Sequence, residues 1–367
     1  MRRVLFGILG VVLLSLPVVG AAAEEAWPMW AEFKRLHLQA DGRVIDNFEG
    51  KAITTSEGQA YALFFAVVAD DRRQFDLLWR WTVNNLMQGD ESTWLPAWKW
   101  GKDETSGSWK VLDANSASDA DVWIAYSLLQ AAQRWNSAEY RKAGMQLLGR
   151  IARREVVDLP GVGWMMLPAS YGYALAPARW RVNPSYLPIQ VMRYFAKVDA
   201  EGPWCDLITN TEFMLGAVAG AGGVPDWVVY TPEKGFQPDP EMGRISGYEA
   251  IRVYLWWGML DHSDQSHHKL RPLMQRVQAL KPGEATPERI NIETGATEGK
   301  APEGFDGALT PLRKVLYGDD GQPRRALSEN QYYSSVLKLF GYGWLDGRFK
   351  FCRDGSLVTK VSKPCLN

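Results

Sequence analysis

Apolar residues recur at helical spacing through most of the chain, and this pattern restricts the possible fold more than any other feature of the sequence. Between 124 and 135 they return every three or four residues, which places them on one face of a helix. Segments of the same amphipathic kind cover 72–87, 140–156 and 331–344. Runs of alternating β-branched residues are few. We therefore expect a mainly helical protein.

No linker or shift in composition divides the chain after its first residues. The least helical portion is 281–307, where Pro and Gly recur and 289–293 reads as one strand of a short hairpin. About 340 residues exceed the usual size of a single domain, but closed barrels and toroids pass that limit. We expect residues 24–367 to form one domain, a helical toroid with minor β-hairpin excursions.

The N-terminus has the pattern of a secretory signal peptide. Arg2 and Arg3 precede an apolar run over 4–19, and three alanines follow at 21–23. The apolar run is shorter than the ~20 residues that a membrane-spanning helix needs. We expect residues 1–23 to be cleaved, which predicts a periplasmic or secreted protein with no membrane contact after cleavage.

The charge balance excludes two classes of partner. The chain has 41 Lys plus Arg and 42 Asp plus Glu, a formal net charge of −1. Binding to nucleic acid or to an anionic membrane needs a basic surface, which this composition does not indicate.

Cysteine and histidine usage gives no sign of a metal centre. Export makes a disulfide possible; Cys352 and Cys365 are the local candidate pair, which leaves Cys205 unpaired. The histidine-rich segment 261–270 has no flanking set of ligands. We interpret it as a solvated loop and expect neither a metal nor another cofactor.

Three of the predicted helices begin with a serine followed within three residues by carboxylates. These are Ser56 with Glu57, Ser118 with Asp119 and Asp121, and Ser246 with Glu249. The helix dipole favours acids at this end, and a serine can form a capping box with the side chain three residues on. Gln59, Asp121 and Glu249 stand at that third position, so a structural role is one explanation for each pair.

Capping does not require aromatic neighbours, yet each of these helix starts lies among Trp and Tyr residues. Most of the 17 tryptophans must be core residues, because aromatic side chains bury a large area. In a toroid, the N-termini of one layer of helices converge on one face. Carboxylates ringed by aromatics there suit a neutral polysaccharide, whose hydrolysis needs one protonated and one ionised carboxyl flanking the scissile bond.

The segment "ASDADVWIAYSLLQAAQRW", 117–135, resembles the signature of glycoside hydrolase family 8. "TSEGQAYALFF", "LPAWKWGK", "NPSYLP", "PDWVVY", "YEAIRVYLWWGM" and "YYSSVLKLFG" follow the order expected for the family's periplasmic endoglucanases that accompany bacterial cellulose synthesis. The resemblance implies an (α/α)6 barrel and inverting hydrolysis of internal β-1,4-glucosidic bonds of cellulose. It also implies no cofactor and makes the cellulose synthesis and export machinery a candidate partner.

The resemblance also implies roles for individual residues. Glu57 matches the family's proton donor, and Tyr186 matches a tyrosine that helps to hold the attacking water. Asp119 matches an active-site position that we interpret as binding and distorting the sugar, since an inverting enzyme forms no covalent intermediate. The donor needs a raised pKa. The helix dipole opposes this, so burial or a neighbouring carboxylate must dominate.

The general base is the position where the chain departs from the family pattern. Many members carry Asp where this chain has Glu249, whose carboxylate reaches one methylene further. We favour Glu249 as the base, although it could instead only cap its helix and pair with Arg252. Glu293 is a second candidate.

Substrate contacts are expected from residues near these acids. Arg252 can fix a carboxylate or a sugar hydroxyl. One of Tyr332 and Tyr333 should face the core and the other the sugar, and Trp98 and Trp100 should line the cleft. Two alternative functions remain: a chitosanase or xylanase of the same family, and a non-catalytic glucan-binding subunit of an export complex.

Overall fold

The structure is a computed structural model that describes residues 27–47, 50–319, 321, 325–360 and 365. The predicted signal peptide, 1–23, lies outside the described residues. No helix in these ranges is long and apolar enough to cross a membrane.

Helices are the main secondary structure of the described chain, as predicted. They are α1 (Pro28–His37), α2 (Ser56–Val68), α3 (Arg72–Leu86), α4 (Ser118–Arg134), α5 (Ala138–Arg154), α6 (Ile189–Val198), α7 (Trp204–Val218), α8 (Ile251–Met259), α9 (Gln265–Arg276), α10 (Glu303–Tyr317) and α11 (Tyr332–Leu345), with 3-10 turns η2 (Pro184–Tyr186) and η3 (Gln278–Leu280). The helices predicted over 72–87, 140–156 and 331–344 are confirmed as α3, α5 and α11.

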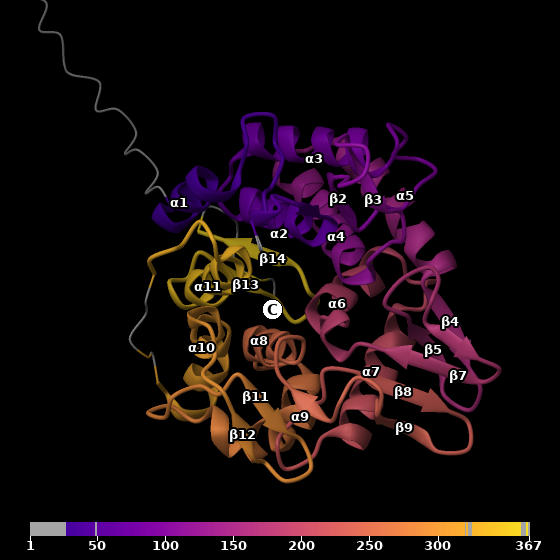
Figure 1. The fold of residues 1–367 in the computed structure, drawn as a ribbon, viewed down its shortest axis with the longest axis vertical. Helices are drawn as coiled ribbons and strands as arrows, with labels where there is room; N and C mark the ends of the chain where they lie inside the picture. The colour runs from indigo at the N-terminus through magenta and orange to yellow at the C-terminus, as the bar shows by residue number, and fades with distance from the viewer. Residues whose placement is uncertain (1–26, 48–49, 320, 322–324, 361–364, 366–367) are drawn as a thin grey trace, which may run out of the picture.

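The helices form a closed double ring, which confirms the predicted toroid (Figure 1). The inner ring runs α2, α4, α6, α8, α10, α11, and each helix packs on the next. Helices α3, α5, α7 and α9 pack outside this ring, and α1 packs against α11.

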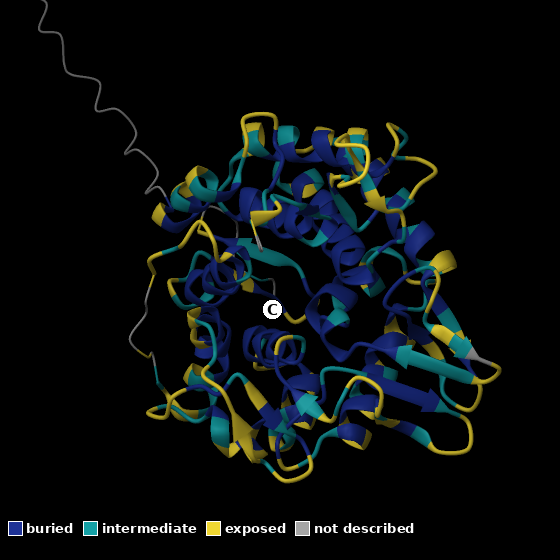
Figure 2. Cartoon of the chain, in the orientation of Figure 1, coloured by how far each residue is buried: buried dark blue, intermediate teal, exposed yellow. Residues whose placement is uncertain are grey.

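Sequence composition separates the inner helices from the outer ones. Every residue of α2 except Glu57 is buried, because its sequence is apolar on nearly all sides. Outer helices such as α3 and α5 alternate buried and exposed positions. Figure 2 shows the same division, with buried residues concentrated in the inner ring. The exception in α2 is therefore a carboxylate placed among apolar neighbours.

Aromatic side chains fill the centre between the inner helices. Phe340 of α11 lies 4.7 Å from Phe65 and 5.3 Å from Phe64, both in α2, between ring centroids. It also lies 5.3 Å from Trp123 in α4 and 5.3 Å from Trp256 in α8. These contacts tie α11 to α2 and close the ring. The expectation that most tryptophans are core residues is not met, because 8 of the 17 are buried.

The strands form small antiparallel sheets outside the helical ring. They are β1 (Thr54–Thr55), β2 (Lys99–Lys102), β3 (Trp109–Asp113), β4 (Val156–Leu159), β5 (Gly163–Met166), β6 (Ala174–Ala176), β7 (Arg179–Val182), β8 (Val228–Thr231), β9 (Gly235–Pro238), β10 (Ile245–Ser246), β11 (Arg289–Asn291), β12 (Thr297–Glu298), β13 (Phe349–Phe351) and β14 (Leu357–Thr359). The hairpin predicted within 281–307 is confirmed as β11 and β12. The four-stranded sheet β6–β7–β8–β9 was not predicted.

The interpretation of 261–270 as a solvated loop is wrong for its second half. Asp264 caps α9 by accepting a hydrogen bond from the Ser266 backbone N–H at 2.7 Å, and the helix begins at Gln265. His267 is buried and stacks on Trp257 with 4.6 Å between ring centroids. Among the described residues, no group of three or more His, Cys, Asp or Glu side chains could hold a metal ion.

The predicted disulfide is confirmed. Cys352 and Cys365 are bonded, with 5.6 Å between their Cα atoms. Cys205 is free and exposed, as expected.

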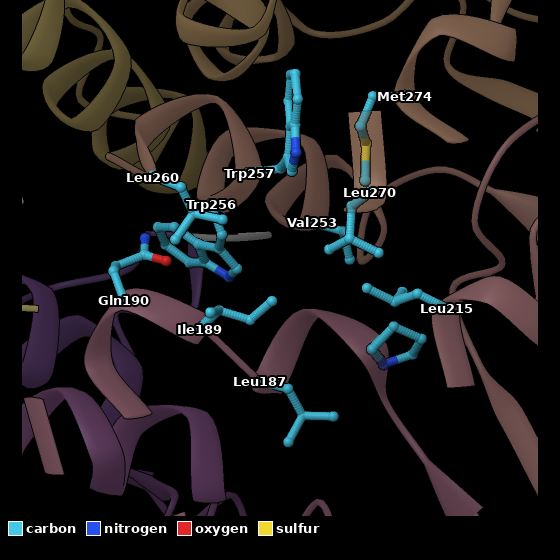
Figure 3. A pocket seen from close by; sticks show the side chains of 11 residues that line it. Leu187, Ile189, Gln190, Leu215, Val253, Trp256, Trp257, Leu260, Leu270 and Met274 are labelled. Atoms are coloured by element: carbon cyan, nitrogen blue, oxygen red, sulfur yellow. The ribbon is translucent and has the colours of Figure 1, made fainter. Parts of the chain in front are cut away.

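A small apolar cavity lies where α8 meets α6, α7 and α9 (Figure 3). Its volume of about 20 Å³ is room for one water molecule. Gln190 is the polar residue of its lining, and the buried side-chain amide has no hydrogen-bond partner among the described residues. A volume of this size excludes any larger ligand.

Candidate active site

The guanidinium of Arg252 binds three carboxylates, which come from two inner helices and from the turn before a third. Its Nη1 donates to Glu57 Oε2 at 2.7 Å and to Asp119 Oδ2 at 2.8 Å. Its Nη2 donates to Glu249 Oε2. Glu57 and Asp119 lie in the first turns of α2 and α4, and Glu249 lies in the turn before α8. The structure therefore brings the three predicted catalytic residues together.

The predicted capping box of Ser56 and Gln59 is wrong. Thr55 is the N-cap of α2, and its hydroxyl accepts a hydrogen bond from the Gly58 N–H at 3.1 Å. The buried Gln59 side chain instead accepts from the Val44 N–H at 2.7 Å. Strand β1 ends at Thr55, which is therefore the last residue before α2 and occupies the N-cap position. Ser56 is already the first residue of the helix.

The other two capping boxes are also wrong. Ser118 is inside α4, which has no side-chain cap. Ser246 belongs to β10, and its hydroxyl lies 3.0 Å from the Tyr254 hydroxyl. Asp226 holds the turn before α8, accepting from the N–H groups of Gly247 at 2.7 Å and Ala250 at 2.8 Å. The carboxylate of Glu249 is thereby left free to bind Arg252.

Burial sets the electrostatics of the site. It raises the pKa of Glu57 to about 8, and the positive charge of Arg252 opposes this rise. The neighbouring carboxylates of Asp119, Glu249 and Asp46 raise the pKa further. The pKa of Asp119 is also raised, mainly by burial. Burial and the neighbouring carboxylates, the two causes expected from the sequence, both raise the pKa of Glu57, and burial is the larger.

Two of the three carboxylates remain open to solvent. The side chains of Glu57 and Glu249 are 21% and 28% exposed, whereas those of Asp119 and Arg252 are each 4% exposed. A substrate or water molecule can thus reach the two acids that were assigned to proton transfer, while the cation and the third acid lie beneath them.

Three tyrosines surround the cluster. The Tyr186 and Tyr333 rings lie over the Arg252 guanidinium, 5.3 Å and 6.0 Å from their centroids. Tyr333 is half-buried and donates to the Tyr248 carbonyl at 2.7 Å. Tyr332 is buried, with its hydroxyl 3.5 Å from Glu57 Oε1. Tyr332 is thus the more buried of the two and Tyr333 the more open; which of them faces sugar stays a prediction.

The two tryptophans predicted to line the cleft have different surroundings. Trp98 adjoins the start of α2, where its carbonyl accepts from the Ser56 N–H at 3.0 Å. The Trp100 ring packs against Trp81 and Trp109, and the groove that it lines contains none of the clustered carboxylates.

Glu293, the second candidate for the base, lies apart from the cluster. It is exposed and forms an ion pair with Arg244.

Sequence reasoning missed several residues that support the cluster. Asp226 has a pKa raised to about 6, chiefly by burial, and Ser185 donates to Glu249 at 3.3 Å. The Tyr61 hydroxyl accepts from Arg252 at 3.2 Å. Asp226 belongs to "PDWVVY", one of the segments that resemble the family. A carboxylate in such a segment could have indicated a residue that supports the site.

A second pair of buried acids is formed by Asp121, in the first turn of α4, and Glu155, which follows α5. Asp121 adjoins Glu155, whose Oε1 accepts from the Ser116 hydroxyl at 2.6 Å. Burial raises the pKa of Glu155 to about 8 and that of Asp121 well above its ordinary value. Two buried, adjacent carboxyls cannot both ionise, so the pair retains a proton at neutral pH.

A helical double ring with two solvent-open acids on one arginine provides the pair of carboxyls that glycoside hydrolysis needs. The chain belongs to glycosyl hydrolases family 8, whose sequence model matches residues 4–347. It is 43% identical over 369 residues to an endoglucanase of Escherichia coli (strain K12), covering 98% of each chain. It is also similar to the crystal structure of an endo-1,4-D-glucanase from Vibrio fischeri ES114, with 37% identity, a TM-score of 0.83 and coverage of 91% and 99%. A cold-adapted family 8 xylanase shares the fold at 16% identity and a TM-score of 0.64, covering 83% of each chain.

Arg252→Met should destabilise the protein in a pH-dependent way. Removing the cation leaves buried carboxylates without a counter-charge, so we expect the free energy of unfolding to fall by about 3–5 kcal/mol at pH 7. The loss should be smaller at pH 5, because carboxyls that no longer face Arg252 have higher pKa values and take up protons there. Denaturant titrations at both pH values measure this. Arg35→Met, which breaks the exposed pair with Glu32, should change little at either pH; equal losses for the two variants would contradict the prediction.

Proposed function

We propose that the protein is an endo-β-1,4-glucanase that cleaves internal bonds of cellulose with inversion at the anomeric carbon. The observation that carries the proposal is the pair of solvent-open acids, Glu57 and Glu249, on separate nitrogens of one buried guanidinium. Inverting hydrolysis needs two carboxyls that stand apart, one to protonate the leaving oxygen and one to activate water. The endoglucanase names of the relatives support the substrate class.

Glu57 acts as the general acid. Its raised pKa, about 8, keeps the carboxyl protonated at neutral pH, so it can donate that proton to the glycosidic oxygen as the bond breaks. The partial exposure of its side chain provides access to the bond. Tyr332, beside the second carboxyl oxygen, fixes the orientation of the group.

Glu249 acts as the general base. Arg252 and the Ser185 hydroxyl hold its carboxylate, and Asp226 fixes the turn that carries it. These contacts give the longer Glu side chain a defined position in place of the shorter Asp. Tyr186, whose ring covers the guanidinium, helps to hold the attacking water.

Asp119 binds and distorts the sugar at the point of cleavage. Its carboxylate is fixed by Arg252 and by the Ala120 N–H at 2.8 Å, and its low exposure suits a fixed charge better than proton exchange with water. A fixed negative charge beneath the sugar favours the oxocarbenium-like transition state. Tyr333 and Trp98 contribute surface for the sugar rings on either side.

Glu57→Gln should abolish most hydrolysis without preventing folding. Losing the acid is expected to lower kcat by about 10²–10⁴-fold on carboxymethylcellulose, measured as release of reducing ends. In the wild type, activity should be lost as the pH rises through about 8, because the protonated form of Glu57 disappears there.

Wild-type activity should also be greater on carboxymethylcellulose than on chitosan or xylan. Equal sugar release by variant and wild type would mean a non-catalytic glucan-binding protein.

Glu249→Gln should lower kcat by a similar factor, about 10²–10⁴, whereas Glu249→Asp should retain part of the activity because it keeps a carboxylate. Glu293→Gln is the matched control, since it removes an exposed carboxylate paired with Arg244. The same reducing-end assay measures all three. Loss of activity in Glu293→Gln with activity retained in Glu249→Gln would reverse the assignment of the base.

The protein acts in the periplasm or outside the cell, on glucan that the cellulose synthesis and export machinery produces or releases. The basic and apolar pattern of residues 1–23 supports export, and the family resemblance supports the link to cellulose synthesis. N-terminal sequencing of protein recovered from the periplasm or the medium should begin at Glu24. A mature protein that retains Met1 would contradict export by cleavage.

A further inference from the structure

We propose a second, non-catalytic binding site for a β-1,4-glucan chain in the groove between α3 and the β2–β3 hairpin. The inference rests on the proposed substrate class and adds a site away from the carboxylate cluster. The groove has a volume of about 680 Å³, and none of Glu57, Asp119, Glu249 and Arg252 lines it. Its main features are a wall of tryptophans and a rim of amide and charged side chains.

The wall consists of three indoles in contact, and their exposure to solvent increases from Trp81 to Trp109. Trp81 is buried and meets the Trp100 ring edge-on, with 5.4 Å between centroids. Trp100 stacks on Trp109 at 5.1 Å with an interplanar angle of 19°. Trp109 is 47% exposed. A flat indole anchored to the core at one end and open to solvent at the other offers the surface on which the apolar face of a sugar ring packs.

Arg43 makes this wall rigid. Its guanidinium lies 4.6 Å from the centroids of both the Trp100 and the Trp109 rings. The same group donates to Thr54 Oγ1 at 2.8 Å and to the Ala52 carbonyl. Cation–π contacts at both rings hold them in place, and side chains that are already ordered lose less entropy when a ligand binds.

The rim supplies both hydrogen-bond donors and acceptors, and it contains charged groups of both signs. Asn84, Gln39 and Arg80 are exposed and offer donors, while Asp41 and the amide oxygens accept. The charge of Arg43 is engaged with the Ala52 carbonyl, the indoles and the nearby carboxylate of Asp41. This chemistry matches the hydroxyls of a neutral polysaccharide, whereas a nucleic acid would require several free cations.

The groove lies at the same end of the barrel as the catalytic cluster. Thr54 pairs with Trp100 across β1 and β2 and stands three residues before Glu57. Gln59, in the first turns of α2, donates to Thr82 in the C-terminal half of α3 at 3.1 Å. One long glucan chain can therefore reach both sites, and binding at two linked sites strengthens the hold on a polymer more than on a short oligomer.

The test compares binding to swollen insoluble cellulose in a Glu57→Gln background, where the substrate stays intact. Adding Trp109→Ala should weaken binding by about tenfold, the effect of losing one aromatic contact, and Trp109→Phe should retain most of the affinity because a flat ring remains. Trp164→Ala is the matched control, since this tryptophan is 43% exposed on β5 and lies outside the groove. Thermal unfolding of each variant checks that it is folded.

A second measurement separates this site from the catalytic one. With Glu57 intact, Trp109→Ala should lower the ratio of activity on insoluble cellulose to activity on cellotetraose, and Trp164→Ala should leave the ratio unchanged. The proposal is overturned if Trp109→Ala binds cellulose like its parent, if Trp164→Ala weakens binding equally, or if both activities fall by one factor. Absence of wild-type hydrolysis of carboxymethylcellulose would instead refute the proposed catalytic function.

Discussion

The buried guanidinium of Arg252 is the interaction on which the rest of the site depends. A cation that is almost entirely removed from water is costly unless opposite charges and hydrogen bonds surround it. Its acidic partners come from α2, α4 and the turn before α8, and they lie up to 195 positions away from Arg252 in the sequence. Only closure of the helical ring brings these partners together, so the charge balance of the site and the fold of the barrel stabilise each other.

The acids are available for this role because other residues satisfy the helix ends. Thr55 caps α2 and Asp226 holds the turn before α8, so neither Glu57 nor Glu249 is bound to free backbone N–H groups of its own helix. A carboxylate engaged in capping would be stabilised in its charged form and would have a lowered pKa. Separating the two tasks allows Glu57 to keep a proton beside a cation.

Sequence reasoning reached the ring of helices and the main acids for identifiable reasons. Helical periodicity predicted helices of both layers, α4 and α11 in the inner ring and α3 and α5 outside it. The pattern over 117–135 indicated the family. The capping boxes failed because Ser56, Ser118 and Ser246 have the local spacing of a cap, and only tertiary neighbours show that their hydroxyls are not used in this way. The four-stranded sheet was missed because its strands are only three or four residues long. The contacts of Arg252 with Glu57 and Asp119 could not be predicted from local spacing.

The protonation pattern follows from the depth of each acid relative to Arg252. Asp119 lies as deep as the guanidinium and binds it directly, with the Ala120 N–H adding a second donor, so its charged form has two compensating contacts. Glu57 also binds Arg252, but its nearest acidic neighbours all favour its neutral form. One cation cannot fully compensate three carboxylates, so a proton must remain in the cluster. The physical requirement to neutralise a buried excess of negative charge is thus the same property that general-acid catalysis needs at Glu57.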